Sequence, residues 1–274
     1  MTLKLFPGVP LEPLSPEAVG TGLATTHFGH AVLHYPSIES TNDVAREQAQ
    51  AGMSEGLLVL AEEQTAGRGR YDRRWDAPYG SALLVSLLLR PTFLAPERAF
   101  LLTAMTALSI AEAVQRETAL DVALKWPNDV LVAGRKVCGI LVELEGTAKS
   151  LDWAIVGWGL NVNVDFSADE ALSPRATSLA EAAGRPFPRL PLLRAGLERM
   201  ETYYEALRAG WWEDVWNGWR AQLAMLGREV EVTTPEETFS GQALDVAIDG
   251  ALLVQREDGQ VERVLAGDVT VGDS

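Results

Sequence analysis

Glu62 to Asp76 reads E-E-Q-T-A-G-R-G-R-Y-D-R-R-W-D, the most basic stretch of an otherwise acidic chain. Four arginines fall within it: Arg68, Arg70, Arg73 and Arg74. Gly67 and Gly69 alternate with the first two arginines, and glycine lets a backbone approach a ligand closely. Arginine offers a flat fork of donors that fits phosphate or carboxylate, so the pattern is typical of a flexible loop that wraps an anion. An exposed basic turn would also explain these letters alone.

The composition limits the class of protein. The chain has 274 residues, of which 47% are hydrophobic, so it can form one large domain or two smaller ones. Acidic residues outnumber basic ones by 38 to 23, and no basic stripe is present, so we expect no DNA partner. The single cysteine, Cys138, excludes an internal disulfide and fits a reducing compartment. No apolar run is long enough for a membrane span and no secretory signal is recognisable, so the sequence predicts a cytoplasmic protein with no membrane partner.

The hydrophobic pattern predicts an α+β fold in three parts: an N-terminal extension over residues 1–31, a large domain over 32–223 and a small β domain over 224–274. The extension is rich in proline, with one short helical turn after Ser15. Helices are predicted at residues 43–51, 96–118, 190–209 and 211–223. Strands are predicted at residues 57–63, 81–89, 122–126, 129–132, 136–144 and 153–164, then at 229–233, 239–248, 251–255 and 261–265. Residues 165–189 are predicted to be a loop, and the tryptophans of 211–219 are predicted to pack in the core.

Three further segments carry candidate chemistry: K-W-P-N-D at 125–129, R-K-V-C-G-I-L-V-E at 135–143 and G-W-G-L-N-V-N at 157–163. Alone, each has a structural explanation: a tight turn, a solvated strand end at Lys136, and a bulged strand with two surface amides. Glycines inside a strand also indicate close backbone approach. No histidine is predicted near Cys138 to activate it as a nucleophile, so we expect a small buried residue there. The three histidines are predicted to lie at the surface.

Taken in order, the four segments together with S-T-N at Ser40 resemble the biotin protein ligases, and the resemblance covers about residues 32–271. It implies a catalytic domain like that of the class II aminoacyl-tRNA synthetases, with a mixed, mostly antiparallel sheet and flanking helices, followed by an SH3-like small β-barrel. Two departures stand out. The N-terminal DNA-binding domain of repressor-type members is missing, which implies the monofunctional type, and Cys138 stands where alanine is common.

The resemblance also implies the reaction. ATP activates biotin to biotinoyl-5′-AMP with release of pyrophosphate, and a lysine of a biotin carboxyl carrier domain then attacks the mixed anhydride. Biotin and ATP are the expected substrates, Mg²⁺ is expected on the ATP phosphates, and no metal held by protein ligands is predicted. Neither step needs a nucleophile from the enzyme. Both need cations placed where negative charge develops in the transition state, and both need water to be excluded.

Site residues follow from the same resemblance, position by position. The catalytic residues would be Arg68, Arg70, Lys136 and Asp129. Biotin would be bound by Ser40, Thr41, Asn42, Gln64, Gly67, Arg68, Gly69, Arg70, Lys136, Gly139, Leu141, Gly157 and Gly159. ATP would be bound by Arg68, Arg70, Arg73, Trp75, Lys136 and Asn161. Asp129 would either assist the incoming amine or orient the phosphate.

Other functions stay open on the sequence alone. A lipoate or octanoate ligase would share the catalytic fold, and a biotin-sensing transcriptional regulator would share the ligand. A catalytically dead scaffold would lack the set of arginines and lysines that this chain retains. An exposed sheet edge could support a homodimer, although no residue identifies one.

Overall fold

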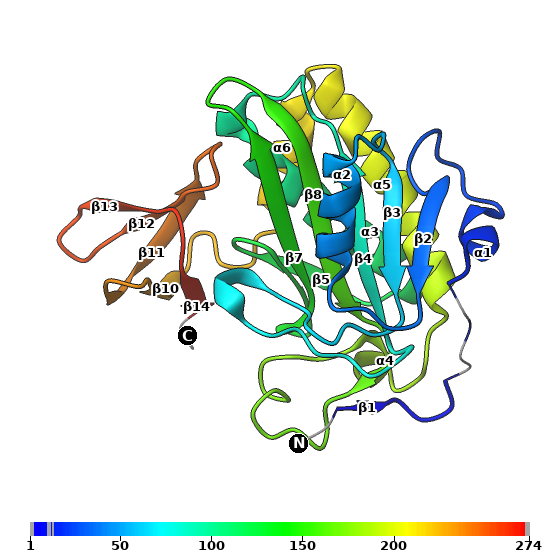
Figure 1. Ribbon diagram of the computed structural model, residues 1–274. Helices are drawn as coiled ribbons and strands as arrows, with labels where there is room; N and C mark the ends of the chain where they lie inside the picture. The colour runs from blue at the N-terminus through cyan, green and yellow to red at the C-terminus, as the bar shows by residue number, and fades with distance from the viewer. Residues whose placement is uncertain (1–2, 10–11, 13, 272–274) are drawn as a thin grey trace.

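Seven strands form the central sheet of the computed structural model, which describes residues 3–9, 12 and 14–271 (Figure 1). Their bounds are β2 Ala31–Tyr35, β3 Leu57–Ala61, β4 Ala82–Leu89, β5 Val122–Lys125, β6 Asp129–Val132, β7 Arg135–Gly146 and β8 Leu151–Asn161. The order across the sheet is β2-β3-β4-β8-β7-β6-β5. Only β2 and β3 pair in parallel, so the predicted mixed, mostly antiparallel sheet is confirmed.

Helices cover both faces of this sheet. Their bounds are α1 Pro16–Gly20, α2 Thr41–Gln50, α3 Phe100–Thr118, α4 Leu179–Ala183, α5 Arg189–Arg208 and α6 Trp212–Ala221. Helix α2 packs Ala45 and Ala49 against β3, β4 and β8, while α3, α5 and α6 pack together in the larger core (Figure 1). Strand β4 is buried along its whole length, as its continuous apolar sequence predicts. None of the helices in the described residues is long and apolar enough to cross a membrane.

The predicted tryptophan stripe is only partly core. Trp216 and Trp219 lie against each other and against Phe100, with edge-on contacts to the phenyl ring. Trp211 is 67% exposed because it precedes α6 and does not share the helix's buried face. The prediction that Trp211 belongs to the core is therefore wrong.

The C-terminal strands form a separate five-stranded antiparallel sheet in the order β13-β12-β11-β10-β14. Their bounds are β10 Glu229–Thr233, β11 Thr238–Val246, β12 Leu252–Gln255, β13 Val261–Val264 and β14 Asp268–Val271. Glycines in the left-handed region form the predicted hairpin turns at Gly250, with φ 91°, and Gly259, with φ 84°. Strand β14 has no counterpart in the predicted pattern, because Val269 is its one fully buried apolar side chain and the apolar signal is therefore weak.

Polar contacts at three places fasten the C-terminal sheet to the large domain, one of them between Arg73 and Asp268 of β14. The indole N–H of Trp126 donates to the carbonyl of Gly250 at 2.7 Å, and Arg220 forms a bidentate ion pair with Asp245. A Cβ atom at Gly250 would lie 2.3 Å from the ring of Phe100, so glycine is required for this close approach. The two sheets are therefore joined by specific contacts as well as by the chain.

The N-terminal extension is part of the fold. The two-residue strand β1 (Lys4–Leu5) pairs antiparallel with β9 (Val164–Asp165), and Ser15 caps α1 by accepting from the N–H of Ala18. The predicted helical turn after Ser15 is confirmed. The segment predicted as loop over 165–189 contains α4, which Ser178 caps through the N–H of Glu181. Five residues are too few to give a helical hydrophobic period, which is why the sequence pattern missed this helix.

A buried carboxylate lies at the start of the arginine-rich loop. Glu62 forms an ion pair with Arg189 at 2.6 Å and accepts from the Leu14 N–H, and His34 Nε2 lies 3.0 Å from it. Arg189 also donates to the carbonyls of Ala82 and Glu12. His34 is therefore half-buried in a polar cluster, and the prediction that it is a surface residue is wrong, whereas His27 and His30 are exposed. The cluster ties the N-terminal extension, β2, β4 and α5 to the base of the loop.

Candidate active site

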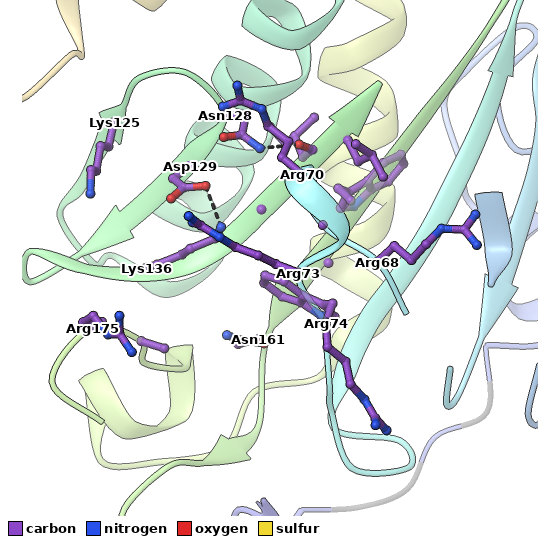
Figure 2. A pocket seen from close by; sticks show the side chains of 18 of the residues that line it. Arg68, Arg70, Arg73, Arg74, Lys125, Asn128, Asp129, Lys136, Asn161 and Arg175 are labelled. Carbon is purple, nitrogen blue, oxygen red and sulfur yellow. Dashed lines mark hydrogen bonds and ion pairs between the residues drawn. The ribbon is translucent and has the colours of Figure 1, made fainter. Parts of the chain in front are cut away.

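The predicted site residues meet in one cavity of about 840 Å³ (Figure 2). Its walls are the arginine-rich flap (residues 64–76), the start of α2, the β6–β8 face of the sheet, the loop 166–176 and strand β14. The predicted residues that line it are Ser40, Thr41, Asn42, Gln64, Arg68, Gly69, Arg70, Arg73, Trp75, Asp129, Lys136, Gly139, Leu141, Gly157, Gly159 and Asn161. Gly67 does not line the cavity: a Cβ there would lie 2.4 Å from the Trp75 carbonyl, so this glycine serves the packing of the flap itself.

The flap folds back on itself as a short hairpin. The N–H of Gly69 donates to the carbonyl of Arg73 at 2.7 Å, and the N–H of Trp75 donates to the carbonyl of Gly67 at 2.9 Å. Tyr71 lies at the tip in the left-handed region, with φ 57°, a conformation that bulky side chains seldom adopt. The close approach of the two flap strands explains Gly67 without any ligand, whereas a Cβ at Gly69 would come no nearer than 3.5 Å to the Arg73 carbonyl and would fit.

The four flap arginines have different partners. Arg68 pairs with Asp43 of α2 at 2.5 Å, and Arg74 pairs with Asp76 at 2.6 Å. Arg73 grips both carboxylate oxygens of Asp268 in β14, and this guanidinium holds the pKa of Asp268 below its ordinary value. Arg70 donates to the hydroxyl of Tyr71 at 3.1 Å. Figure 2 shows Arg73 reaching towards Lys136, while Arg68 and Arg74 point away from it.

Lys136 lies at the centre of the cavity. Its ammonium pairs with Asp129 at 2.7 Å and stands 5.5 Å above the centre of the Trp75 ring. A register shift between β6 and β7 places the start of β7 beside the loop 166–176. Cys138, two residues further on, is fully buried, and burial raises the pKa of its thiol far above the ordinary value. The cysteine therefore stays a thiol, as predicted for a small buried residue.

The glycines of β7 and β8 make room for side chains of the protein itself. Gly139 and Gly159 face each other across the two strands, and the Trp75 indole lies on them. A Cβ at Gly159 would lie 2.4 Å from that indole, and a Cβ at Gly157 would lie 2.1 Å from Oδ1 of Asn42. The strand glycines thus seat Trp75 and Asn42 against the sheet.

A polar cluster closes the α2 end of the cavity. The N–H and hydroxyl of Thr41 both approach Oε1 of Gln64, at 2.7 and 3.0 Å. Below them the buried hydroxyl of Ser86 reaches Thr41 Oγ1 at 2.8 Å and Asn42 Oδ1 at 2.6 Å. The amide nitrogen of Asn42 donates to Glu143 at 3.1 Å, so each polar atom of Asn42 already has a protein partner.

Gly157→Ala is expected to disturb this cluster. The new methyl group would displace the Asn42 amide and break its bonds, which we expect to destabilise the protein by roughly 1–3 kcal/mol. The urea midpoint of unfolding would measure the loss, and calorimetry would report the biotin affinity. Gly196→Ala in α5 is the matched control, because a Cβ there meets nothing within 4 Å. An unchanged midpoint for Gly157→Ala would contradict the packing argument.

The two asparagines at the end of β8 are buried. Asn163 bonds through both amide atoms to the backbone of Phe187, so its role is to hold the chain before α5. Asn161 donates to the carbonyl of Thr177 at 3.2 Å, and its Oδ1 is buried without a partner among the described residues. The alternative of two surface amides is therefore wrong. Asn161 keeps an acceptor atom at the cavity wall.

Several lining residues were not among the site residues that the resemblance implied. They are Lys125 and Asn128 of the K-W-P-N-D segment, Phe166, Leu172, Pro174, Arg175 and Ala176 of the loop, and Asp268 to Val271 of β14. The position of Lys125 at the head of a recognised segment was a usable signal. The loop and β14 gave none, because they reach the cavity only through tertiary packing.

Comparison with known proteins agrees with this geometry. The Biotin/lipoate A/B protein ligase family matches residues 35–161, and the Biotin protein ligase C terminal domain matches residues 225–272. The biotin–[acetyl-CoA-carboxylase] ligase of Paracoccus denitrificans is 33% identical over 231 residues, which cover 81% of this chain and 93% of that protein. The bifunctional ligase/repressor BirA of Bacillus subtilis is 30% identical, covering 94% of this chain and 79% of that protein.

Among solved structures, the biotin protein ligase from Aquifex aeolicus in complex with biotin and ATP superposes with a TM-score of 0.74 at 29% identity. The alignment covers 89% of this chain and 99% of that one. The fold and cavity define a ligase of the biotin and lipoate type. The chain belongs to the biotin protein ligase family.

Proposed function

We infer that this protein is an ATP-dependent biotin protein ligase. It converts biotin to biotinoyl-5′-AMP with release of pyrophosphate and then transfers biotin to a lysine of a biotin carboxyl carrier protein. The observation that carries this conclusion is the single cavity into which four separate segments bring cations, glycines and amides. Its size suits both substrates, since small-molecule pockets typically span about 300–1,000 Å³.

The chemistry needs charge and positioning more than a nucleophile. In the first step a biotin carboxylate oxygen attacks the α-phosphorus, and negative charge builds on the phosphoryl oxygens. Fixed cations in a site that excludes water stabilise such charge strongly. Mg²⁺ enters with ATP as part of the nucleotide substrate. In the second step a lysine amine of the carrier attacks the carbonyl, and AMP leaves.

We propose residue roles from the same arrangement. Lys136 holds the biotin carboxylate and then the phosphoryl oxygens, with Arg68 and Arg70 supplying further charge from the flap. Asp129 positions Lys136 through their ion pair at 2.7 Å, and this pair supports the role of orienting the phosphate, by way of the lysine, over that of assisting the incoming amine. Arg73, Trp75 and Asn161 serve the nucleotide.

The remaining predicted biotin contacts divide into two kinds. Ser40, Thr41 and Gln64 present polar atoms to the ureido ring, and Leu141 gives an apolar wall. Asn42 and the glycines act through packing: Gly157 and Gly159 seat Asn42 and Trp75, Gly139 lies beneath Trp75 and Lys136, and Gly67 and Gly69 shape the flap.

We propose the domain division that the sequence predicts, with residues 32–223 as the catalytic domain, 224–274 as the C-terminal β domain and 1–31 as an extension. Lack of DNA binding, cytoplasmic location and a homodimer stay predictions. The first of these is supported by the net charge of −15, which disfavours approach to a phosphate backbone.

The proposed function is tested by mixing the protein with biotin, Mg-ATP and a biotin carboxyl carrier domain. We expect pyrophosphate release and a carrier whose mass rises by one biotinoyl group on a single lysine. Parallel reactions with lipoate or octanoate in place of biotin identify the related activity. Modification of the carrier by lipoate but not by biotin would contradict the conclusion.

A further inference from the structure

A chain of hydrogen-bonding groups runs from strand β7 to the α2 end of the cavity. The Glu143 carboxylate accepts from the amide nitrogen of Asn42 at 3.1 Å. Oδ1 of Asn42 lies 2.6 Å from the Ser86 hydroxyl oxygen, which lies 2.8 Å from Thr41 Oγ1. Thr41 Oγ1 in turn lies 3.0 Å from Oε1 of Gln64. Thr41 and Gln64 line the cavity, whereas Glu143 and Ser86 do not, so the chain connects the cavity wall with a carboxylate behind it.

Both ends of this chain are fixed as acceptors. An ionised carboxylate accepts hydrogen bonds but cannot donate them, so Glu143 holds the NH₂ group of Asn42 towards itself and Oδ1 towards Ser86. At the other end, the backbone N–H of Thr41 donates to Oε1 of Gln64 at 2.7 Å, which fixes that amide oxygen towards Thr41. Turning the first amide over would bring two acceptors together, and turning the second would bring two donors together.

The chain has fewer hydrogens than contacts. Three oxygen–oxygen contacts lead from Asn42 Oδ1 to Gln64 Oε1, but the hydroxyls between them supply only one hydrogen each, so one contact must lack a hydrogen. Ser86 is fully buried and Asn42 is 5% exposed, so a missing hydrogen between these two would be costly. Thr41 and Gln64 border the cavity, where a ligand can supply it. The favoured arrangement therefore points the Thr41 hydrogen at Ser86 and the Ser86 hydrogen at Asn42.

This arrangement leaves two acceptors at the cavity wall. Thr41 Oγ1 and Gln64 Oε1 lie 3.0 Å apart with no hydrogen between them, so both favour a ligand that donates. A ligand with an N–H group at this place supplies the missing hydrogen bond, whereas an alkyl chain or a dithiolane ring leaves it unmade. Sites built to hydrogen-bond a group of the substrate discriminate strongly against analogues that lack the group.

We propose that Glu143 sets the direction of the hydrogen bonds in this chain and so makes the site selective for a ligand with a ring N–H donor. The inference rests on the proposed function, in which the ureido ring lies at this end, and deepens it by assigning the selection to a positioning residue outside the cavity wall. Without Glu143, the Asn42 amide can turn over and donate to Ser86. The two hydroxyl hydrogens would then point towards Gln64, every contact would have its hydrogen, and the cavity would lose its free acceptors.

The test follows adenylate formation, by pyrophosphate release, in Glu143→Ala with biotin and with desthiobiotin, which keeps the ureido ring but lacks the thioether ring. Octanoate, which has neither ring, serves as a competitor. We expect the KM for both ureido substrates to rise roughly tenfold, the size of one lost hydrogen bond, while kcat and the inhibition constant for octanoate stay unchanged. Glu143→Gln should recover part of the loss, because its amide oxygen can still accept from Asn42. Glu145→Ala, which removes an exposed carboxylate two residues further along β7, should match wild type.

Ser86→Ala interrupts the same chain at a second point. Without the Ser86 hydroxyl, the Thr41 hydrogen turns to Gln64, so the KM for both ureido substrates should again rise while octanoate inhibition stays unchanged. This variant decides the matter if Glu143→Ala does not fold.

Two results would overturn the inference. A KM for biotin within twofold of the wild-type value in Glu143→Ala would show that the acceptors do not depend on this carboxylate. An inhibition constant for octanoate that rises in parallel would show a general loss of pocket shape in place of a loss of selectivity. If wild type itself formed no biotinoyl-AMP, the proposed function would fail and the inference with it, which is distinguishable from variants that equal an active wild type.

Discussion

Lys136→Ala should slow formation of biotinoyl-AMP by roughly 10²–10³-fold, the loss seen when one fixed group that stabilises transition-state charge is removed. The substitution removes the central cation of the cavity. It also leaves the Asp129 carboxylate without the ammonium that pairs with it at 2.7 Å, so that an uncompensated negative charge faces the phosphates. Both changes raise the free energy of the anionic transition state. Release of pyrophosphate in the presence of biotin, followed over a single turnover, would measure the rate.

Stability should change little in the same variant, since the Lys136 side chain is about one-third exposed and its ion pair is not deeply buried. Lys136→Arg is the matched variant: it keeps the charge, and we expect a rate between those of wild type and Lys136→Ala. A Lys136→Ala enzyme that retained more than half of the wild-type rate would disprove the central role of this lysine. A large loss of stability would show that the effect on rate is indirect.

Arg189→Ala should lower the free energy of unfolding by about 3–5 kcal/mol, because it leaves the buried Glu62 carboxylate without its cation. Arg189 and Glu62 are each about 95% buried, and the arginine also satisfies two backbone carbonyls. Urea denaturation would give the difference. An exposed arginine, Arg228, is the control, and Arg228→Ala should change stability by no more than about 0.5 kcal/mol.

Acid should weaken the same cluster. Burial alone would raise the pKa of Glu62, but Arg189, His34 and the Leu14 N–H together hold that pKa below its ordinary value. The unfolded state therefore binds the proton more tightly than the folded state does. The stabilisation from ionised Glu62 is fully present above the ordinary glutamate pKa of about 4.3 and is lost as the pH falls below it. In Glu62→Gln this part of the acid dependence should disappear; an unaltered acid profile would exclude Glu62 as its source.

Much of the fold could be predicted because local pattern and tertiary role coincide. The unbroken apolar run of β4 is buried on both faces, and the hairpin glycines at Gly250 and Gly259 adopt the conformation that their sequence context predicts. The site residues that the family resemblance implied, position by position, likewise meet in the cavity, since all but one of them line it. In these places a few neighbouring residues carry all the necessary information.

Other features depend on packing that no local pattern encodes. Helix α4 is too short to show a helical period, and strand β14, which lines the cavity, has one fully buried apolar side chain. The glycines of β7 and β8 were read as room for a ligand, whereas they adjoin Trp75 and Asn42, which come from segments more than 60 residues away. Which side chain fills the space above a strand glycine is decided by tertiary structure alone.

The grip of Arg73 on Asp268 has a consequence for engineering. The two residues lie 195 positions apart, and the carboxylate from β14 forms part of the cavity wall. A chimera that grafts the terminal sheet of a relative onto this catalytic half would inherit a different partner for Arg73 and a different neighbour for Phe100. Such a hybrid would keep these contacts only if the grafted sheet carried an acidic residue opposite Arg73 and a glycine opposite Phe100.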